Sequence, residues 1–289
     1  MRLRTPAKVT LALRVLAPRP DGYHEVQGAL VPVSLYDTLA IDRIPDKGLS
    51  LEVDSPEFLG PVEDNLVWRA ARRFESVAGF RLGAKLRLTK HIPSGAGLGG
   101  GSGNAAGTLV ACNLLCGAPL SAAALHEAAA ELGSDVPFFL APRPCWVAGR
   151  GEVLRELRGF PGLHLLVVKP SFGIATGPAY VALAQTRHGR VPAAQEPPPL
   201  TTVDEVVAAL HNDFEPVLFD RYSELAEVKA SLIAAGARGA LLSGTGSALF
   251  GIFETAAARD GARAELARAG RWQVFACATL AHHAYESES

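Results

Sequence analysis

Cysteine and methionine are scarce in this sequence, and the few cysteines are widely spaced. The 289 residues contain four cysteines and one methionine. Four scattered cysteines are too few for a disulfide scaffold. Only Cys112 and Cys116 fall on one face of a predicted helix, and no histidine stands beside them, so we expect small buried apolar residues rather than metal ligands.

The sequence also lacks an excess of charge and any long hydrophobic run. Lysine and arginine total 28 against 29 aspartates and glutamates, which gives no electrostatic basis for binding nucleic acid or an acidic membrane. No apolar run reaches the roughly 18 residues of a membrane span, and residues 1–10 lack the apolar core of a signal peptide. We therefore expect a cytoplasmic monomer or homodimer whose partner is a small molecule, not nucleic acid or a membrane.

Glycine, in contrast, is concentrated in one segment. Residues 93–104 read Pro-Ser-Gly-Ala-Gly-Leu-Gly-Gly-Gly-Ser-Gly-Asn, between a predicted strand at 84–92 and a predicted helix at 105–115. Glycine lets the backbone approach a ligand closely, and the unpaired N–H groups of a first helical turn attract anions. A flexible connection is the alternative, but the dense apolar helix that follows argues against it. The segment predicts a phosphate site.

Two familiar phosphate motifs fit this loop poorly. A Walker A loop ends in Gly-Lys-Ser/Thr, whereas this loop ends Gly101-Ser102-Gly103 without a lysine. The dinucleotide fingerprint is formally met by glycines 95, 97 and 100, but it requires a second parallel strand downstream. Residues 121–132 instead predict a second helix, with Ser121 as its N-cap and Gly133 as its end. The order strand, helix, helix disfavours a Rossmann domain.

The remaining hydrophobic pattern mixes strands and helices over a length that favours two domains. Asp64 is the predicted N-cap of a helix at 65–78, and residues 20–22 predict a turn. The pattern further predicts strands at 8–16, 23–33, 39–43, 143–157 and 163–169, helices at 203–210 and 222–235, and a strand, tight loop and strand at 240–253.

Three sites carry residues that could take part in chemistry. Lys8 stands at the head of an apolar strand, where a charge is out of place unless an anion faces it; a surface lysine is the alternative. Asp135 follows a helix end and precedes a proline, where a helix N-cap is the alternative. Tyr23 and His24 could simply flank a turn. Each residue alone carries no conclusion.

Together with the glycine loop, these residues make the chain resemble the GHMP small-molecule kinases over nearly its whole length. The resemblance implies an α+β fold with an N-terminal ATP-binding lobe at 1–155, a C-terminal ferredoxin-like lobe at 156–289 and an active site in the cleft. It rests on Pro6-Ala7-Lys8, Arg19-Pro20-Asp21-Gly22-Tyr23-His24, Glu63-Asp64-Asn65-Leu66, residues 93–106, Leu132-Gly133-Ser134-Asp135-Val136-Pro137 and Ser243-Gly244-Thr245-Gly246.

The resemblance also implies the reaction, the transfer of a phosphoryl group from ATP with Mg²⁺ to an alcohol. Lys8 and Asp135 would be the catalytic pair, with Asp135 receiving or orienting the proton of the hydroxyl. Lys8 would hold that carboxylate ionised and help neutralise the phosphoryl group. Positioning and electrostatic stabilisation supply most of the rate of such reactions.

Binding residues follow from the same resemblance. The motifs Asp-Gly-Tyr-His and Gly-x-Asp-Val-Pro resemble those of family members that act on a cytidine diphosphate derivative of methylerythritol. The cytosine base of that substrate would stack on an aromatic ring. Ser102 would lie near Mg²⁺. The ATP site would comprise Asn65 and Lys90 toward the adenine, and Pro93, Ser94, Gly95, Ala96, Gly97, Leu98, Gly99, Gly100, Gly101, Ser102, Gly103 and Asn104 around the phosphates; the substrate site would comprise Thr10, Tyr23, His24, Thr176, Tyr180, Gly244, Thr245 and Gly246.

Two positions depart from the pattern of the family. Thr10 replaces an asparagine and offers a hydroxyl that can bind substrate, and Gly103 replaces a second serine, which affects the expected metal or phosphate contacts. Two alternatives remain: a homoserine-, mevalonate- or sugar-type kinase, which would have no cytosine for Tyr23 and His24 to hold, and a nucleotide-binding protein without catalysis.

Overall fold

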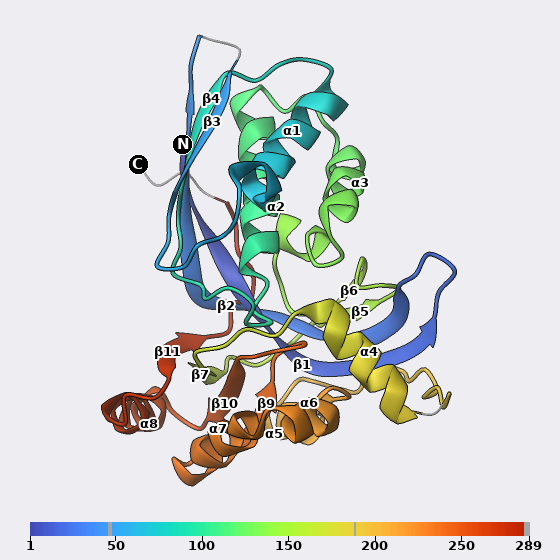
Figure 1. Ribbon diagram of the computed structural model, residues 1–289, viewed down its shortest axis with the longest axis vertical. Coiled ribbons are helices and arrows are strands. Elements are labelled where there is room, and N and C mark those ends of the chain that lie inside the picture. Colours follow the sequence, from blue (N-terminus) through green and yellow to red (C-terminus); the bar gives the residue numbers. More distant parts are fainter. Residues whose placement is uncertain (46–47, 188, 286–289) are drawn as a thin grey trace.

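The computed structural model describes residues 1–45, 48–187 and 189–285, which form two sheets with helices packed on them (Figure 1). The predicted order of strand, helix and helix around the glycine loop is confirmed. It consists of β4 (Ala84–Thr89), α2 (Gly100–Leu115) and α3 (Ala122–Leu132). Ser121 caps α3 as predicted, because its side chain accepts the N–H of Ala124.

The first sheet is built on a long antiparallel pair, β1 (Arg2–Pro18) and β2 (His24–Arg43). The turn between them falls where the sequence predicts it, and the Asp21 carboxylate accepts the N–H of Tyr23. The strand order is β3-β4-β2-β1-β8, with β5 pairing β2 and β6 pairing β5. The remaining strands of this sheet are β3 (Leu49–Asp54), β5 (Cys145–Ala148), β6 (Val153–Glu156) and β8 (His211–Asn212).

One face of the first sheet is covered by α1 (Leu66–Ala78), α2 and α3 (Figure 1). Helix α1 buries Val67, Ala70, Ala71 and Phe74, whose spacing of three and four residues places them on one side of the helix. Burial of such a stripe is what stabilises a helix of this length. The predicted N-cap is wrong by one residue, because Asn65 accepts the N–H of Val67 while residue 64 lies in a short 3-10 turn.

The second sheet is antiparallel, with strand order β11-β7-β10-β9. The first of its strands in the sequence lies between the fourth and the third, and the second pairs with the third, the strand order of a ferredoxin-like lobe. Its strands are β7 (His164–Lys169), β9 (Gly239–Leu242), β10 (Leu249–Phe253) and β11 (Gln273–Ala278), and the helices of this half are α4 (Thr176–Arg187), α5 (Val203–Ala208), α6 (Glu215–Arg221), α7 (Ser223–Ala234) and α8 (Ala256–Arg268).

Several boundaries differ from the sequence prediction. The single strand expected at 143–157 is the hairpin β5–β6, since residues 149–152 turn the chain back. Helix α2 begins at Gly100, five residues before the predicted start, because the glycines themselves form its first turn. The boundary at residue 155 stays a prediction, since β8 from the later half joins the first sheet. Within the described residues, no helix is both long and apolar enough to cross a membrane.

Candidate active site

The glycine loop is folded by residues with left-handed backbones. Gly95, Gly97 and Gly99 have φ of 59°, 73° and 68°, a region that side chains with a Cβ rarely enter. The Lys8 N–H donates to the carbonyl of Leu98 over 2.9 Å, which joins the loop to β1. The sequence therefore fixes a tight loop against the strand that carries the predicted catalytic lysine.

A second loop, residues 243–247 between β9 and β10, packs directly on the first. A Cβ added at Gly97 would lie 1.9 Å from the carbonyl oxygen of Ser243, so only glycine allows this approach. The Ser243 hydroxyl donates to the Gly97 carbonyl over 3.0 Å and accepts the Thr10 N–H over 3.3 Å. Three segments far apart in the sequence, namely β1 and the two loops, thus meet at one serine.

The first turn of α2 faces a large cavity. Gly99 is the N-cap and, among the described residues, no side chain caps this helix end. Gly100, Gly101 and Ser102 line the cavity, and N–H groups at the first turn of a helix have no partner within the helix. Such an end attracts anions through its N–H groups and the helix dipole. The first turn of α2 therefore offers donors of the kind that the predicted phosphate site requires.

Gly103 is the one predicted cofactor residue that does not line the cavity. Its N–H donates to the Gly99 carbonyl, and a Cβ added there would lie 2.9 Å from the carbonyl oxygen of Pro6. Its glycine is explained by the close packing of α2 on β1. The structure thus gives a packing reason for the glycine at this position.

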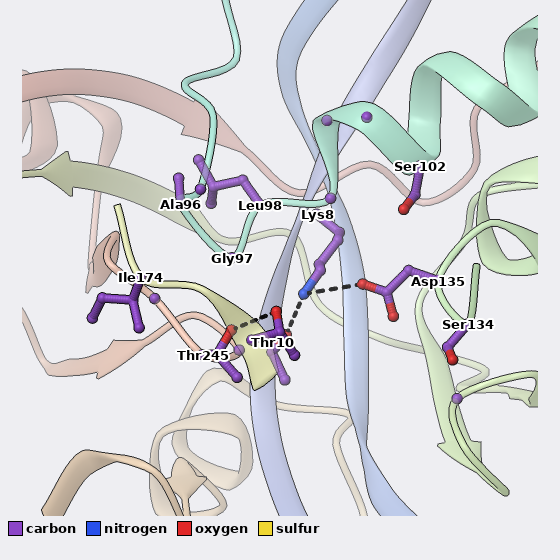
Figure 2. A pocket seen from close by; sticks show the side chains of 18 of the residues that line it. Lys8, Thr10, Ala96, Gly97, Leu98, Ser102, Ser134, Asp135, Ile174 and Thr245 are labelled. Carbon is purple, nitrogen blue, oxygen red and sulfur yellow. Dashed lines mark hydrogen bonds and ion pairs between the residues drawn. The ribbon is translucent and has the colours of Figure 1, made fainter. Parts of the chain in front are cut away.

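Lys8 and Asp135 face each other across the cavity (Figure 2). The Lys8 ammonium lies 3.7 Å from the Asp135 carboxylate and donates to the Thr10 hydroxyl over 2.9 Å. The lysine side chain is buried, with 5% of its surface exposed, whereas 38% of the aspartate side chain is exposed. Asp135 does not act as the helix N-cap weighed as an alternative, because Val136 occupies that position without a side-chain cap. Its carboxylate is open to a ligand.

Lys90 lies at the cavity but is held from beneath by a buried polar network. Its ammonium pairs with the carboxylate of Asp37, which is fully buried, and donates to the Asn104 amide oxygen over 3.2 Å. The same carboxylate accepts the N–H groups of His91 and Ile92. Asp37 therefore fixes both the residues that enter the glycine loop and, through Asn104, the first turns of α2.

We predict that Asp37→Asn destabilises the protein by about 3–5 kcal/mol, because it leaves the buried Lys90 ammonium without its counter-charge. The free energy of unfolding in urea measures the effect. The matched control is Asp42→Asn, which breaks an exposed pair with Arg87 and should cost less than about 1 kcal/mol. Equal losses for the two variants would contradict the assigned role of Asp37.

The other end of the cavity is aromatic and holds the residues predicted for the substrate. The rings of His24 and Tyr180 lie 5.1 Å apart, and the hydroxyls of Thr176 and Thr245 lie 3.3 Å apart. Burial raises the pKa of Tyr180 to about 12, so its hydroxyl stays protonated. Tyr23, Gly244 and Gly246 line the same space. All predicted substrate residues thus line one cavity.

Arg150 is a cavity residue that sequence reasoning missed. It stands in the β5–β6 turn with its guanidinium carbon 4.9 Å from the centre of the Tyr23 ring, and it donates to the Ala130 carbonyl over 2.8 Å. The next residue, Gly151, approaches Asp135: a Cβ added there would lie 3.8 Å from the carboxylate. Among the described residues, Arg150 has no carboxylate at ion-pair distance. The Gly-Arg-Gly sequence of the turn is the signal that could have found it.

Cys112 is buried as predicted, and so are Cys145 and Cys277, whereas Cys116 at the end of α2 is only partly buried. Burial raises the pKa of Cys112 to about 12 and that of Cys145 to about 11, so both remain thiols. In the described part of the chain, no group of three or more histidine, cysteine, aspartate or glutamate side chains is placed to hold a metal ion.

The cavity has a volume of about 1070 Å³ and runs from Asn65 and the glycine loop, past Lys8 and Asp135, to Tyr23 and Tyr180. This is at the upper limit of sites for one small ligand, roughly 300–1000 Å³. It therefore has room for two ligands placed end to end, one at the phosphate loop and one at the aromatic end, with the lysine and aspartate between them.

Family models described as GHMP kinases N terminal domain and GHMP kinases C terminal match residues 65–142 and 199–271. The fold and the site accordingly define a small-molecule kinase of the GHMP class. Among similar proteins, the 4-diphosphocytidyl-2-C-methyl-D-erythritol kinase of Syntrophotalea carbinolica is 38% identical over 275 residues, covering 94% of this chain and 96% of that protein. That of Pelotomaculum thermopropionicum is 42% identical over 249 residues, covering 85% and 86%.

Solved structures agree with this assignment. A crystal structure of 4-(cytidine 5'-diphospho)-2C-methyl-D-erythritol kinase superposes with a TM-score of 0.80 at 33% identity, covering 96% of this chain and 99% of that one. The homoserine kinase of Cytophaga hutchinsonii, at 18% identity and a TM-score of 0.73, shares the fold. The chain therefore belongs to the 4-diphosphocytidyl-2-C-methyl-D-erythritol kinase family.

Proposed function

We propose that the protein transfers the γ-phosphoryl group of ATP to the 2-hydroxyl of 4-diphosphocytidyl-2-C-methyl-D-erythritol, a step of the non-mevalonate isoprenoid precursor pathway. The observation that carries the proposal is the Lys8–Asp135 pair, which lies in one cavity between a phosphate-binding helix end and an aromatic end. The family's named members act on this substrate. We further propose that the enzyme works in the cytoplasm as a monomer or homodimer.

In this proposal Asp135 accepts the proton of the attacking hydroxyl. Its exposed carboxylate can reach the substrate, and the Lys8 ammonium lies 3.7 Å away as its counter-charge. The lysine also places a positive charge beside the phosphoryl group as it is transferred. Because the transition state of phosphoryl transfer is loose, the proton can leave late, and a weak base suffices. The N–H groups at the start of α2 bind the ATP phosphates.

The chain fits Mg²⁺ as the metal that accompanies ATP. Mg²⁺ binds oxygen, keeps several waters and uses few protein ligands when phosphates are present. Ser102 supplies a hydroxyl at the first turn of α2, on the side of Lys8 that Asp135 occupies (Figure 2). The Ser102 hydroxyl is thus the protein oxygen proposed to hold the ion. When bound, the ion neutralises charge on the β- and γ-phosphates.

We assign Arg150 to the diphosphate of the substrate, because its guanidinium lies over the Tyr23 ring and the next residue, Gly151, approaches Asp135. We predict that Arg150→Gln raises the KM for 4-diphosphocytidyl-2-C-methyl-D-erythritol, the cytidyl substrate, by about 10- to 100-fold and leaves the KM for ATP unchanged. This factor corresponds to the binding free energy lost with one charged hydrogen bond. Steady-state kinetics measure both. Arg155→Gln, on the exposed side of the same hairpin, is the control. An equal rise in both KM values would contradict the assignment.

The experiment that tests the proposed function is ADP release from ATP and Mg²⁺ with the cytidyl substrate, beside mevalonate, homoserine and galactose. Turnover of the cytidyl substrate alone supports the proposal. Turnover of another alcohol would keep the kinase and discard this substrate. Absence of turnover with every alcohol would favour a nucleotide-binding protein without catalysis.

A further inference from the structure

Residues 211–215 bridge the two halves of the molecule. The short strand β8 joins β1 in parallel, with Ala12 beside His211 and Leu13 beside Asn212, and α6 begins at Glu215. The segment is thus part of the first sheet, although it lies between helices of the second half. Among the described residues, its members are not in the lining of the substrate cavity.

The Asn212 side chain bonds the end of β9, the second loop and Phe214. The side-chain nitrogen donates to the carbonyls of Leu242 and Gly244, over 2.8 and 2.7 Å, and the side-chain oxygen accepts the N–H of Phe214 over 3.0 Å. Only 4% of the residue is exposed. Because the two carbonyls stand on either side of Ser243, one buried side chain fixes the backbone of that serine.

Ser243, in turn, connects the glycine loop to β1, the strand that carries Lys8. It is fully buried, and its hydroxyl joins Gly97 of the loop to Thr10, the residue that accepts from Lys8. A Cβ added at Gly244 would lie 3.3 Å from the Lys8 ammonium, so the backbone of the second loop comes close to the catalytic lysine. A shift of residues 242–244 would therefore move the phosphate loop and Lys8 relative to each other.

The neighbours of Asn212 secure the same arrangement. Asp213 accepts the Val15 N–H of β1 and pairs with Arg187 of α4, the helix that carries Tyr180. Burial acts to raise the pKa of Asp213, but the hydrogen bonds of His211 and the Val15 N–H, with the Arg187 charge, hold it below its ordinary value. Glu215 accepts the N–H of Leu242 over 2.9 Å. The segment thus ties β1, α4 and the second loop together.

We infer that Asn212 is a positioning residue of the kinase: it holds Leu242 and Gly244 so that Ser243 keeps the glycine loop in register with the strand of Lys8. The inference rests on the proposed function. Asn212 itself does not line the cavity. Its effect should therefore fall on kcat, since misplacement of about 1 Å costs roughly 100-fold in rate, while the distant aromatic end still binds the substrate.

Asn212→Asp tests this inference with minimal change of shape. The variant keeps an oxygen for the Phe214 N–H but turns another oxygen toward two carbonyls. The matched control is Asn113→Asp: Asn113 is also a buried asparagine, which bonds both the N–H and the carbonyl of Leu120. It lies near the far end of α2 and outside the cavity lining.

We expect Asn212→Asp to lower kcat about 30- to 100-fold, with the KM for the cytidyl substrate changed less than about threefold, and Asn113→Asp to keep both constants at a comparable loss of Tm. Amide hydrogen exchange over residues 94–104 and 239–250 should rise in the first variant alone. Kinetic constants of Asn212→Asp equal to those of Asn113→Asp would overturn the inference.

A second variant and a measurement on the parent protein complete the test. If Asn212→Asp does not fold, Ser243→Ala replaces it, and a kcat within twofold of the parent protein would overturn the inference. Failure of the parent protein to turn over the cytidyl substrate would instead contradict the proposed function. In that case the exchange measurement still tests whether Asn212 holds the two loops.

Discussion

Asp135→Asn is expected to lower kcat by about 10³-fold, within the range for loss of a general base, while the KM for ATP and the Tm stay close to those of the parent protein. The amide keeps the shape of the carboxylate but accepts no proton. Because the carboxylate is only half-buried and its pair with Lys8 spans 3.7 Å, little folding stability depends on it. Steady-state ADP release and a thermal melt measure the two quantities.

The control for this variant is Asp260→Asn, another aspartate beside a cation, which pairs with Arg259 on α8 away from the cavity. It should retain the parent kcat. Lys8→Met should resemble Asp135→Asn in kcat. Activity of Asp135→Asn within tenfold of the parent protein would contradict the role of Asp135 as proton acceptor.

Gly97→Ala is expected to abolish ATP binding and to destabilise the protein. The added Cβ would lie 1.9 Å from the Ser243 carbonyl oxygen, closer than any two such atoms can approach, so the two loops must separate. The left-handed backbone of Gly97 adds about 1–2 kcal/mol of strain. Titration calorimetry with a non-hydrolysable ATP analogue measures binding, and urea unfolding measures stability.

Gly79→Ala is the control for Gly97→Ala, because it introduces the same backbone strain without the steric clash. Gly79 ends α1 with a φ of 76°, but a Cβ added there meets nothing within 4 Å. This variant should lose only about 1–2 kcal/mol of stability and bind the analogue like the parent protein. Normal analogue binding by Gly97→Ala would show that the close contact of the loops is not needed for the phosphate site.

Features that depend on neighbouring residues could be predicted from the sequence. The glycine loop, the helices on either side of Ser121 and the turn at 20–22 all have local causes, in backbone freedom, capping and turn chemistry. The start of α2 was placed too late, because the low helix propensity of glycine favours a loop. Packing of that turn against Pro6 and Phe139 overrides the propensity.

Features that depend on distant partners could not be predicted. Lys90 was expected at the adenine, but its counter-charge Asp37 stands 53 residues earlier in the sequence. Ser243 meets Gly97 across 146 residues. Neither partner belongs to a local pattern, since a buried ion pair or a carbonyl contact leaves no periodic trace in the sequence. The positions of the candidate site residues were therefore accessible, but not what holds them.

Phosphorus NMR of the product tests the central claim most directly, after incubation of the protein with ATP, Mg²⁺ and the cytidyl substrate. Carbon 2 of the methylerythritol unit is tertiary and bears no hydrogen. The account predicts a new phosphomonoester signal without proton coupling, beside an intact diphosphate. A phosphomonoester signal split by protons on its carbon, or release of inorganic phosphate alone, would contradict it.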